Sequence, residues 1–213
     1  MDSPSHRRRK EARPGEIAAA ALELFVERGF AATRLDDVAA RAGVSKGTVY
    51  LYFDSKETLF KAAIEAAMTP AVEAAEALAN EERPAAELLR CFVSGWWQMV
   101  GSTALGGLPK LLVAESGNFP DIARWFHESM IRRAQKAMAR IIATGIARGE
   151  FRQEDPDVAA RVFFAPMFSY VIWQRSFDTT VCDLPAPEQF FETALGLLID
   201  GLANHKRTRK VTP

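Results

Sequence analysis

The chain has 213 residues, of which 48% are hydrophobic and 25% are charged, as is typical of a soluble globular protein with a substantial core. Its 27 basic and 27 acidic residues give a net charge of zero, so the whole chain lacks the basic excess that marks a polyanion-binding protein. No apolar run reaches the roughly eighteen residues that span a bilayer. We therefore expect a cytoplasmic protein without a membrane segment.

The two cysteines, Cys91 and Cys182, are far apart in apolar surroundings and show no CxxC pattern or other metal-ligand spacing. Such usage indicates a reducing compartment and core packing. We predict no metal and no cofactor. The sequence leaves a redox role for either cysteine open.

Basic residues crowd the first 13 positions, namely Arg7, Arg8, Arg9, Lys10 and Arg13. They predict a disordered basic arm over residues 1–13, which serves either solubility or contact with DNA phosphates. From there on, apolar residues recur at helical spacing, and no segment alternates as a half-buried strand does. The predicted fold class is therefore all-α, with about nine helices.

The region that follows the arm contains three short, tightly punctuated helical segments. The first begins after the proline of "RPGEI" and ends at Gly29. The second lies within "TRLDDVAARAG", where we expect Thr33 to cap its start and Gly43 to end it. The third begins at Ser45 and ends near Asp54.

Longer helices, richer in Phe, Trp and Met, come next. One opens at Ser55 and either ends or bends at Pro70. The others are expected at about 84–103, 105–115, 120–149, 156–177 and 187–204. The change of pattern near residue 60 predicts a domain over residues 14–60 and a second over residues 61–213.

The third short helix has two chemically different faces. On a helical wheel Val49 and Phe53 share the inner face, whereas Leu51 lies about 200 degrees from Val49. The outer face and its borders carry Lys46, Gly47, Thr48, Tyr50, Leu51 and Tyr52, without an acidic group. Lysine and tyrosine can donate to phosphates, threonine can reach a base edge, and leucine can meet a thymine methyl. This face suits the major groove of DNA better than it suits water.

Two short helices joined by "AGVS" make a helix-turn-helix, in which the first helix braces and the second inserts into DNA. Lys56, at the start of the following helix, has the reach to clamp a phosphate. The alternative at this level is a helical hairpin whose outer face is solvated or covered by the second domain.

The run "GFAATRLDDVAARAGVSKGTVYLYFDSKETLFKAA" closely resembles the DNA-binding domain of TetR/AcrR-type bacterial transcriptional regulators. The resemblance covers about the first 65 residues, and "AGVSKGT-Y-YF-SKE-L" is its most specific part. It implies an all-helical homodimer with a variable C-terminal domain that binds a small ligand.

The resemblance also implies DNA contacts, which fall on Arg34, Ser45, Lys46, Gly47, Thr48, Tyr50, Leu51, Tyr52 and Lys56. Arg34 stands where many members have a hydroxyl residue that caps the second helix, so we assign that cap to Thr33. The charge of Arg34 can still bind phosphate. Position 51 varies in the family, so Leu51 is expected to bear on the choice of operator.

In the family the last two helices usually form a four-helix dimer interface. The matching segments are 156–177 and 187–204, and both are apolar enough to bury a face against a second copy of the chain. The alternative is that these segments are ordinary core.

Candidates for a ligand cavity are the aromatic, methionine and polar residues Trp96, Met99, Glu115, Trp125, His127, Met130, Phe164, Met167, Phe168 and Trp173. A lining of this kind favours a lipophilic, flat ligand. Each of these residues could equally be an ordinary core or hydrogen-bonded residue.

We expect a ligand-responsive DNA-binding regulator: a repressor that leaves a pseudo-palindromic operator when a small lipophilic molecule binds. A second hypothesis is a ligand-independent regulator whose C-terminal domain only dimerises or docks a protein partner. An enzyme is not expected, because the sequence holds no HExxH, ExxH or nucleophile–base pattern.

Overall fold

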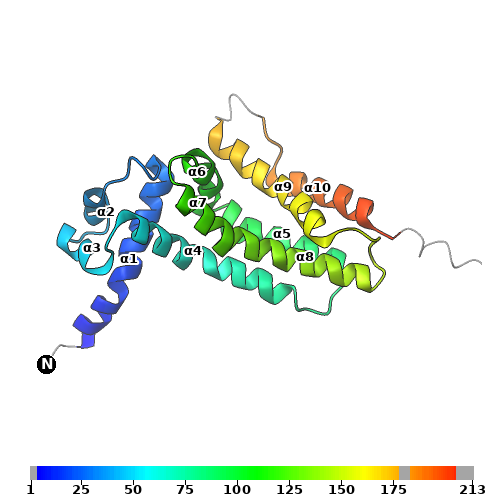
Figure 1. The fold of residues 1–213 in the computed structure, drawn as a ribbon, viewed down its shortest axis with the longest axis horizontal. Helices are drawn as coiled ribbons and strands as arrows, with labels where there is room; N and C mark the ends of the chain where they lie inside the picture. The colour runs from blue at the N-terminus through cyan, green and yellow to red at the C-terminus, as the bar shows by residue number, and fades with distance from the viewer. Residues whose placement is uncertain (1–3, 178–182, 205–213) are drawn as a thin grey trace, which may run out of the picture. The chain divides into compact units, whose positions relative to one another are not determined.

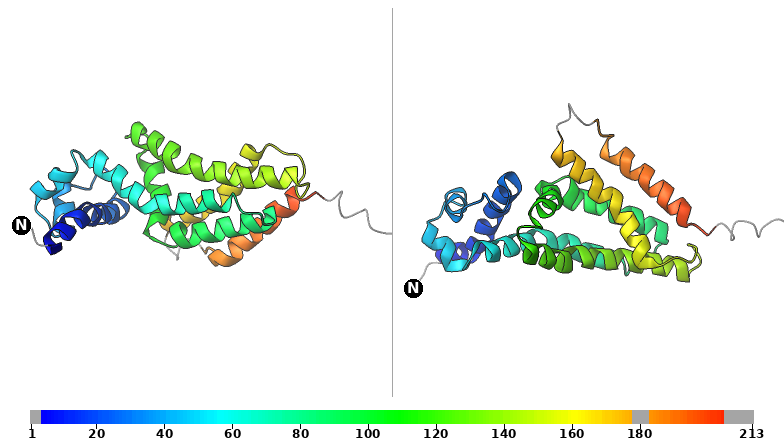
Figure 2. Two further views of the ribbon diagram at one scale, coloured as in Figure 1. Left: turned by 90° about the horizontal axis from the view of Figure 1, so that it is seen from below. Right: turned by 45° about the horizontal axis from the view of Figure 1, so that its top comes forward.

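The computed structural model describes residues 4–177 and 183–204, and the regular elements of this part of the chain are all helices (Figures 1 and 2). The predicted all-α fold class is confirmed. Within these residues, an isolated bridge between Phe151 and Ala203 is the one extended pairing. None of the described helices is long and apolar enough to cross a membrane. Cys182 lies outside the described residues.

The chain folds into two compact units. The first unit extends to Pro70 and also includes Lys110–His127, whereas the second contains Ala71–Pro109 and the chain from Glu128 onward. This division differs from the predicted boundary at residue 60, because residues 110–127 pack with the N-terminal helices. The reason is aromatic packing, because the ring of Phe119 lies edge-on to that of Phe30 at 4.7 Å.

The first unit comprises α1 (Pro4–Arg28), α2 (Leu35–Arg41), α3 (Lys46–Tyr52), the first part of α4 (Lys56–Leu78), most of α6 (Leu108–Glu115) and α7 (Pro120–Phe126). Buried rings hold it together. The ring of Phe60 lies 5.0 Å from both Phe25 and Phe30, in edge-to-face geometry. Helices as short as α2 and α3, of seven residues each, are not stable alone and depend on this core.

The second unit contains the end of α4, α5 (Ala85–Trp96), α8 (Arg132–Ala147), α9 (Pro156–Ser176) and α10 (Pro187–Leu202). Figure 2 shows α9 beside α8 and α10, and α8 and α10 also pack against α5. Leu89, Met138 and Ile141 are among the fully buried side chains of the resulting core.

Most helix boundaries agree with the sequence pattern. Gly29 and Gly43 follow α1 and α2 with φ values of 89° and 64°, a left-handed conformation that glycine adopts without steric cost. α4 continues through Pro70 to Leu78. The helix predicted over 120–149 is α7 and α8, joined by the π-helical segment His127–Ile131. If α7 and α8 are counted as one helix, the described part of the chain has nine α-helices, the expected number.

The structure gives residues 4–13, where the sequence predicts a disordered arm, a helical backbone, because α1 begins at Pro4. Arginine, lysine, alanine and glutamate, which dominate this stretch, all have high helix propensity. Extending an existing helix also costs much less than nucleating a new one. The basic residues at the N-terminus are therefore carried on a helical backbone that is continuous with the first unit.

Candidate nucleic-acid interface

α3 begins with a side-chain cap. The Oγ of Ser45 accepts a hydrogen bond of 3.1 Å from the backbone N–H of Thr48, and the two hydroxyls lie 2.8 Å apart. A serine N-cap stabilises a helix by about 1 kcal/mol relative to alanine. Ser45 is exposed and Thr48 is partly exposed, so both lie at the surface where α3 starts.

The two faces of α3 are those that the helical wheel predicts. Val49 is 0% exposed and Phe53, at the end of the helix, is 7% exposed, whereas Tyr50 is 48% and Leu51 is 71% exposed. Gly47 is also open, since a Cβ there would meet only the Oγ of Ser45, at 3.8 Å. The outward surface of α3 thus combines an aromatic ring, a leucine and exposed backbone.

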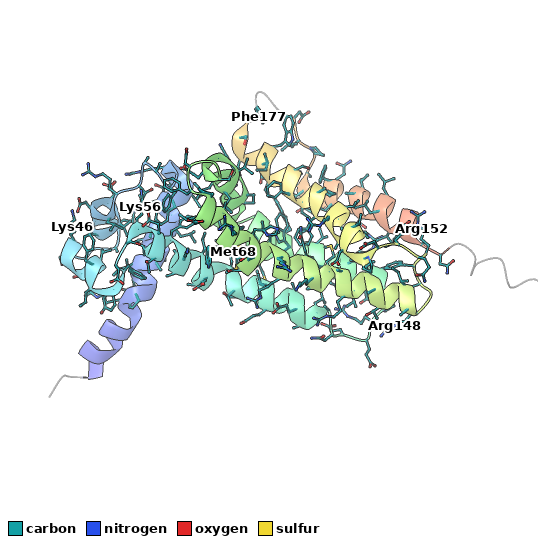
Figure 3. All side chains as sticks on the ribbon, in the orientation of Figure 1. Lys46, Lys56, Met68, Arg148, Arg152 and Phe177 are labelled. Atoms are coloured by element: carbon teal, nitrogen blue, oxygen red, sulfur yellow. The ribbon has the colours of Figure 1, made fainter. Side chains whose placement is uncertain are left out.

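Lys46, the first residue of α3, forms an ion pair with Asp36 of α2. Its Nζ lies 2.8 Å from Oδ1 and 3.0 Å from Oδ2, and the side chains are 55% and 47% exposed. The hydrogen bond to Asp36 raises the pKa of Lys46, which keeps the ammonium charged. Figure 3 shows Lys46 at the surface of the first unit. Exposed ion pairs contribute little net stability, so a phosphate can compete for this lysine.

Arg34 stands at the N-cap position of α2 and its side chain makes no cap hydrogen bond, as predicted. The side chain is exposed, and its charge lies close enough to Lys46 to oppose the protonation of that residue. Two cations therefore lie near each other at the starts of α2 and α3, in a position to meet the same polyanion.

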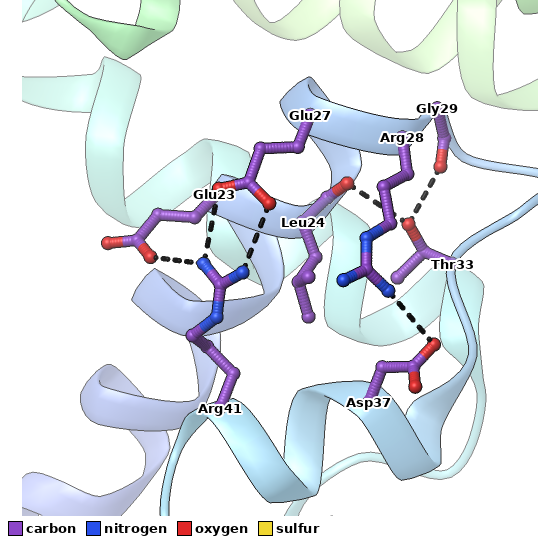
Figure 4. A network of polar contacts seen from close by, with 8 residues as sticks. All are labelled: Glu23, Leu24, Glu27, Arg28, Gly29, Thr33, Asp37 and Arg41. Atoms are coloured by element: carbon purple, nitrogen blue, oxygen red, sulfur yellow. Dashed lines mark hydrogen bonds and ion pairs between the residues drawn. The ribbon is translucent and has the colours of Figure 1, made fainter.

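Thr33 does not cap α2, so that prediction is wrong. The residue is 1% exposed, and its hydroxyl lies 2.7 Å from the carbonyl oxygen of Gly29 and 3.2 Å from that of Leu24 (Figure 4). A hydroxyl has one O–H donor. The hydroxyl of Thr33 therefore turns inward and donates chiefly to the nearer of these two acceptors, the carbonyl oxygen of Gly29 just after α1.

Lys56 is not free to act as the predicted phosphate clamp. Its Nζ donates to the carbonyl oxygens of Phe30, Ala31 and Thr33 at 2.9, 3.2 and 3.2 Å. The same atom lies 4.6 Å from the centroid of the Phe30 ring. An ammonium has three N–H donors, and these three acceptors account for all of them. Lys56 therefore holds the turn between α1 and α2 in place.

Ion pairs join α2 to α1 (Figure 4). Arg41 lies 3.0 Å from carboxylate oxygens of both Glu23 and Glu27, and Arg28 lies 3.5 Å from Asp37. The hydrogen bond from Arg41 lowers the pKa of Glu27. These arginines join α1 to α2, whereas Arg34 and Lys46 stand at the starts of α2 and α3 and are therefore the better placed for phosphate contacts.

The second unit gathers aromatic rings at the junction of α5, α9 and α10. The ring of Tyr170 lies 5.6 Å from that of Trp97 and 5.2 Å from that of Phe191. The Tyr170 hydroxyl donates to the carbonyl oxygen of Pro185 at 2.8 Å, and burial raises its pKa. Phe190 completes the group, with its ring 4.9 Å from Tyr170.

Part of the predicted ligand lining lies in or against this aromatic core, namely Trp96, Phe164 and Met167. Sequence reasoning missed Tyr170, Phe190 and Phe191, which fall in the two segments assigned to the dimer interface, although it chose Phe164, Met167, Phe168 and Trp173 from the first of these segments. Their helical spacing was the available signal: Phe190 and Phe191 are consecutive, so they cannot both point to one partner surface.

The other predicted ligand residues are distributed over both units. Met99, Phe168 and Trp173 are exposed and Met130 is buried in the second unit, whereas Glu115, Trp125 and His127 belong to the first. Glu115 is already engaged, since its carboxylate accepts from the Ala31 N–H at 3.1 Å and from the Asn118 amide at 3.3 Å. The ten candidates therefore do not form one cluster.

α9 and α10 also expose aliphatic side chains. Val158 and Val162, one turn apart on α9, are 57% and 48% exposed, and Leu197 on α10 is 74% exposed. Single exposed apolar residues are ordinary, but several on two helices that contact each other make these helices candidates for a protein interface.

Family models match both parts of the chain. Residues 17–63 match the bacterial regulatory proteins of the tetR family, and residues 87–191 match the C-terminal domain of AefR-like transcriptional repressors. The chain belongs to the TetR family. It is a DNA-binding transcriptional regulator, and α2 and α3 are its helix-turn-helix.

Two relatives extend along most of the chain. The HTH-type transcriptional regulator YfiR of Bacillus subtilis is 27% identical over 76% of this chain and 80% of its own length. The fatty acid metabolism regulator protein of the same organism is 24% identical over 92% of this chain and 99% of its own length. The crystal structure of the regulator FadR from Bacillus subtilis with stearoyl-CoA has a TM-score of 0.71, with 22% identity, and covers 88% of this chain and 98% of FadR. This last likeness establishes the shared fold.

Proposed function

We propose that the protein is a repressor that binds a pseudo-palindromic operator as a homodimer and leaves it when a small lipophilic effector binds. The outer face of α3 carries the proposal, because Tyr50 and Leu51 are held out of the core while Val49 and Phe53 anchor the helix. On a helix without a carboxylate, such side chains fit the base edges and thymine methyl groups of a major groove.

The remaining predicted contacts divide by chemistry. Arg34 and Lys46 are cations at the surface and would bind phosphates, which position the protein without reading sequence. Thr48 can reach a base edge beside Tyr50 and Leu51. The small residues Ser45 and Gly47 allow the backbone at the start of α3 to come close to DNA, and Tyr52 borders the same face. A protein with this task works beside the chromosome, in the bacterial cytoplasm.

Direct readout can be tested on a duplex that the full chain selects from a random-sequence library. We expect Tyr50→Ala and Leu51→Ala each to weaken operator binding about tenfold and to relax base preference, because each removes a base contact. Val113→Ala, which shortens an exposed aliphatic side chain of α6, is the matched control. Unchanged affinity and base preference in both α3 variants would contradict direct readout.

A homodimer would present two α3 helices to successive major grooves, about 34 Å apart. The exposed aliphatic side chains of α9 and α10 support the segments 156–177 and 187–204 as the interface. The family's dimeric plan supports it as well.

Two findings support a lipophilic effector. The second unit contains the aromatic group around Tyr170 and Phe191. A full-length relative is a fatty acid metabolism regulator, and FadR, a similar fold, was solved with stearoyl-CoA. Stearoyl-CoA is therefore the first probe, with unacylated coenzyme A as its control.

Stearoyl-CoA should raise the melting temperature of the protein and release the operator, because a ligand acts as a switch only if it binds the two states with different affinity. If neither it nor a panel of other lipophilic compounds changes the melting temperature or operator binding, the ligand-independent regulator is the better description.

A further inference from the structure

The acidic partner of Lys46 is not something that DNA binding requires. Asp36 lies in the first turn of α2, and both of its carboxylate oxygens are within 3.0 Å of the Lys46 Nζ. The two side chains are roughly half exposed, so the pair stands in solvent at the edge of the outer face of α3. It places a negative charge at the start of the helix that is proposed to enter the major groove.

The neighbouring carboxylate is used differently. Asp37 lies in the same turn of α2 and pairs with Arg28 of α1 at 3.5 Å (Figure 4). Both acidic residues have the favourable position for the helix dipole, near the N-terminus of α2. Helix stabilisation therefore applies to both, and the dipole does not explain why Asp36 is directed to Lys46.

We propose that Asp36 is a positioning residue for DNA binding, which holds Lys46 across the helix-turn-helix and lowers DNA affinity by competing with phosphate for its ammonium. This inference rests on the proposed function of α3. It concerns how tightly DNA is bound and leaves the choice of bases to Thr48, Tyr50 and Leu51.

The competition follows from elementary electrostatics. When DNA approaches, Lys46 must either leave Asp36, which strands a carboxylate beside a polyanion, or remain paired and bring that carboxylate close to a phosphate. Both outcomes oppose binding, and both weaken as salt screens the charges, because the Debye length is about 10 Å at 0.1 M ionic strength. Because an exposed ion pair is weak, a phosphate can still displace Asp36 from Lys46.

The test is the full-length Asp36→Asn variant, assayed on the selected operator duplex and on a scrambled duplex of the same length at several salt concentrations. We expect affinity about threefold to tenfold higher at low salt on both duplexes, because phosphate contacts carry no sequence information. The gain should shrink as salt rises, so that the plot of log affinity against log salt becomes steeper.

Two further variants separate this role from a structural one. Asp37→Asn removes the same charge from the same turn, and we expect it to change affinity much less. Lys46→Gln should weaken binding and flatten the salt dependence by about one ion, and in that background Asp36→Asn should give a smaller gain, because only the direct repulsion between the carboxylate and phosphate is then removed. A merely structural bridge would not move the salt slope.

The inference is overturned if Asp36→Asn leaves affinity unchanged or lowers it, if Asp37→Asn gives the same gain, or if the gain persists fully with Lys46→Gln. The proposed function fails separately, if the wild-type chain selects no duplex or if Lys46→Gln, Tyr50→Ala and Leu51→Ala all bind as the wild type does.

Discussion

The two units differ in the size of their cores and in the groups that surround their exposed apolar side chains. The first unit has two seven-residue helices on a small core of phenylalanine rings, and it exposes Tyr50 and Leu51 beside the Lys46–Asp36 ion pair. The second unit has longer helices on a larger core, and it exposes the aliphatic residues Val162 and Leu197. The exposed side chains of the first unit suit DNA, whereas those of the second unit are proposed to meet a second copy of the chain.

If the first unit depends on its aromatic core, Phe60→Ala should give the largest stability effect. Phe60 is 1% exposed and touches two other rings, so its loss should lower the free energy of unfolding by about 3–5 kcal/mol. Urea denaturation followed by circular dichroism measures the change. The exposed Val113→Ala variant should change it by less than about 0.5 kcal/mol, and a loss of similar size in both would refute the dependence.

The apolar surface of the second unit can be broken by charge. We expect the Val162→Glu, Leu197→Glu double variant to sediment as a folded monomer, because a dimer would have to bury two unpaired carboxylates in each protomer. Operator binding should fall at least about a hundredfold, since one α3 reads only a half-site. Val113→Glu, another exposed aliphatic position, should remain dimeric. A dimeric double variant would exclude this surface as the interface.

Two lysines of the first unit test whether its cations serve DNA or the fold. Lys56→Met should lower the free energy of unfolding by about 2 kcal/mol, because three hydrogen bonds from a charged donor are lost, and should leave the salt slope of DNA binding unchanged. Lys46→Met should leave the free energy of unfolding nearly unchanged and should flatten the salt slope of DNA binding. Unfolding curves measure the stability of both variants, and salt titrations measure the salt dependence of their DNA binding. A flattened salt slope for Lys56→Met would show that Lys56 contacts phosphate.

The smallest expected effect lies in the second unit, where Arg133 binds Glu76 through two parallel hydrogen bonds of 2.9 and 2.8 Å. The hydrogen bonds lower the pKa of Glu76 below its ordinary value of 4.5. A lowered carboxyl pKa contributes stability above the unfolded pKa, and this stability is lost as pH falls through the folded pKa. Because both side chains are partly exposed, Glu76→Gln should cost less than about 1 kcal/mol at pH 7 and nothing below about pH 3. Denaturation at both pH values measures it, and an equal cost at both would indicate that charge is not involved.

The faces of α3 were predictable because they follow from a local period. Val49 and Phe53 fall on one side of a helix whatever the rest of the chain does, and Gly29 and Gly43 end helices through their own backbone freedom. The all-α class followed from the same periodicity, repeated along the chain.

The roles that could not be predicted depend on partners distant in the sequence. Lys56 donates to carbonyl groups up to 26 residues earlier, and Glu115 accepts from an amide 84 residues away. Nothing near either residue in the sequence signals these acceptors and donors. The ligand candidates were chosen by residue type, and only tertiary packing separates the buried Met167 from the exposed Phe168 beside it.

The division of the chain bears on how regulators of this kind can exchange parts. Residues 110–127 belong to the first unit, where Leu111 and Phe119 line a small apolar pocket with Phe30 and Phe60. A chimera joined at residue 70 would therefore pack the phenylalanine rings of one parent's N-terminal helices against residues 110–127 of the other parent. Recombination can combine the operator preference of one regulator with the effector preference of another only if residues 110–127, or their packing residues, come from the same parent as the N-terminal helices.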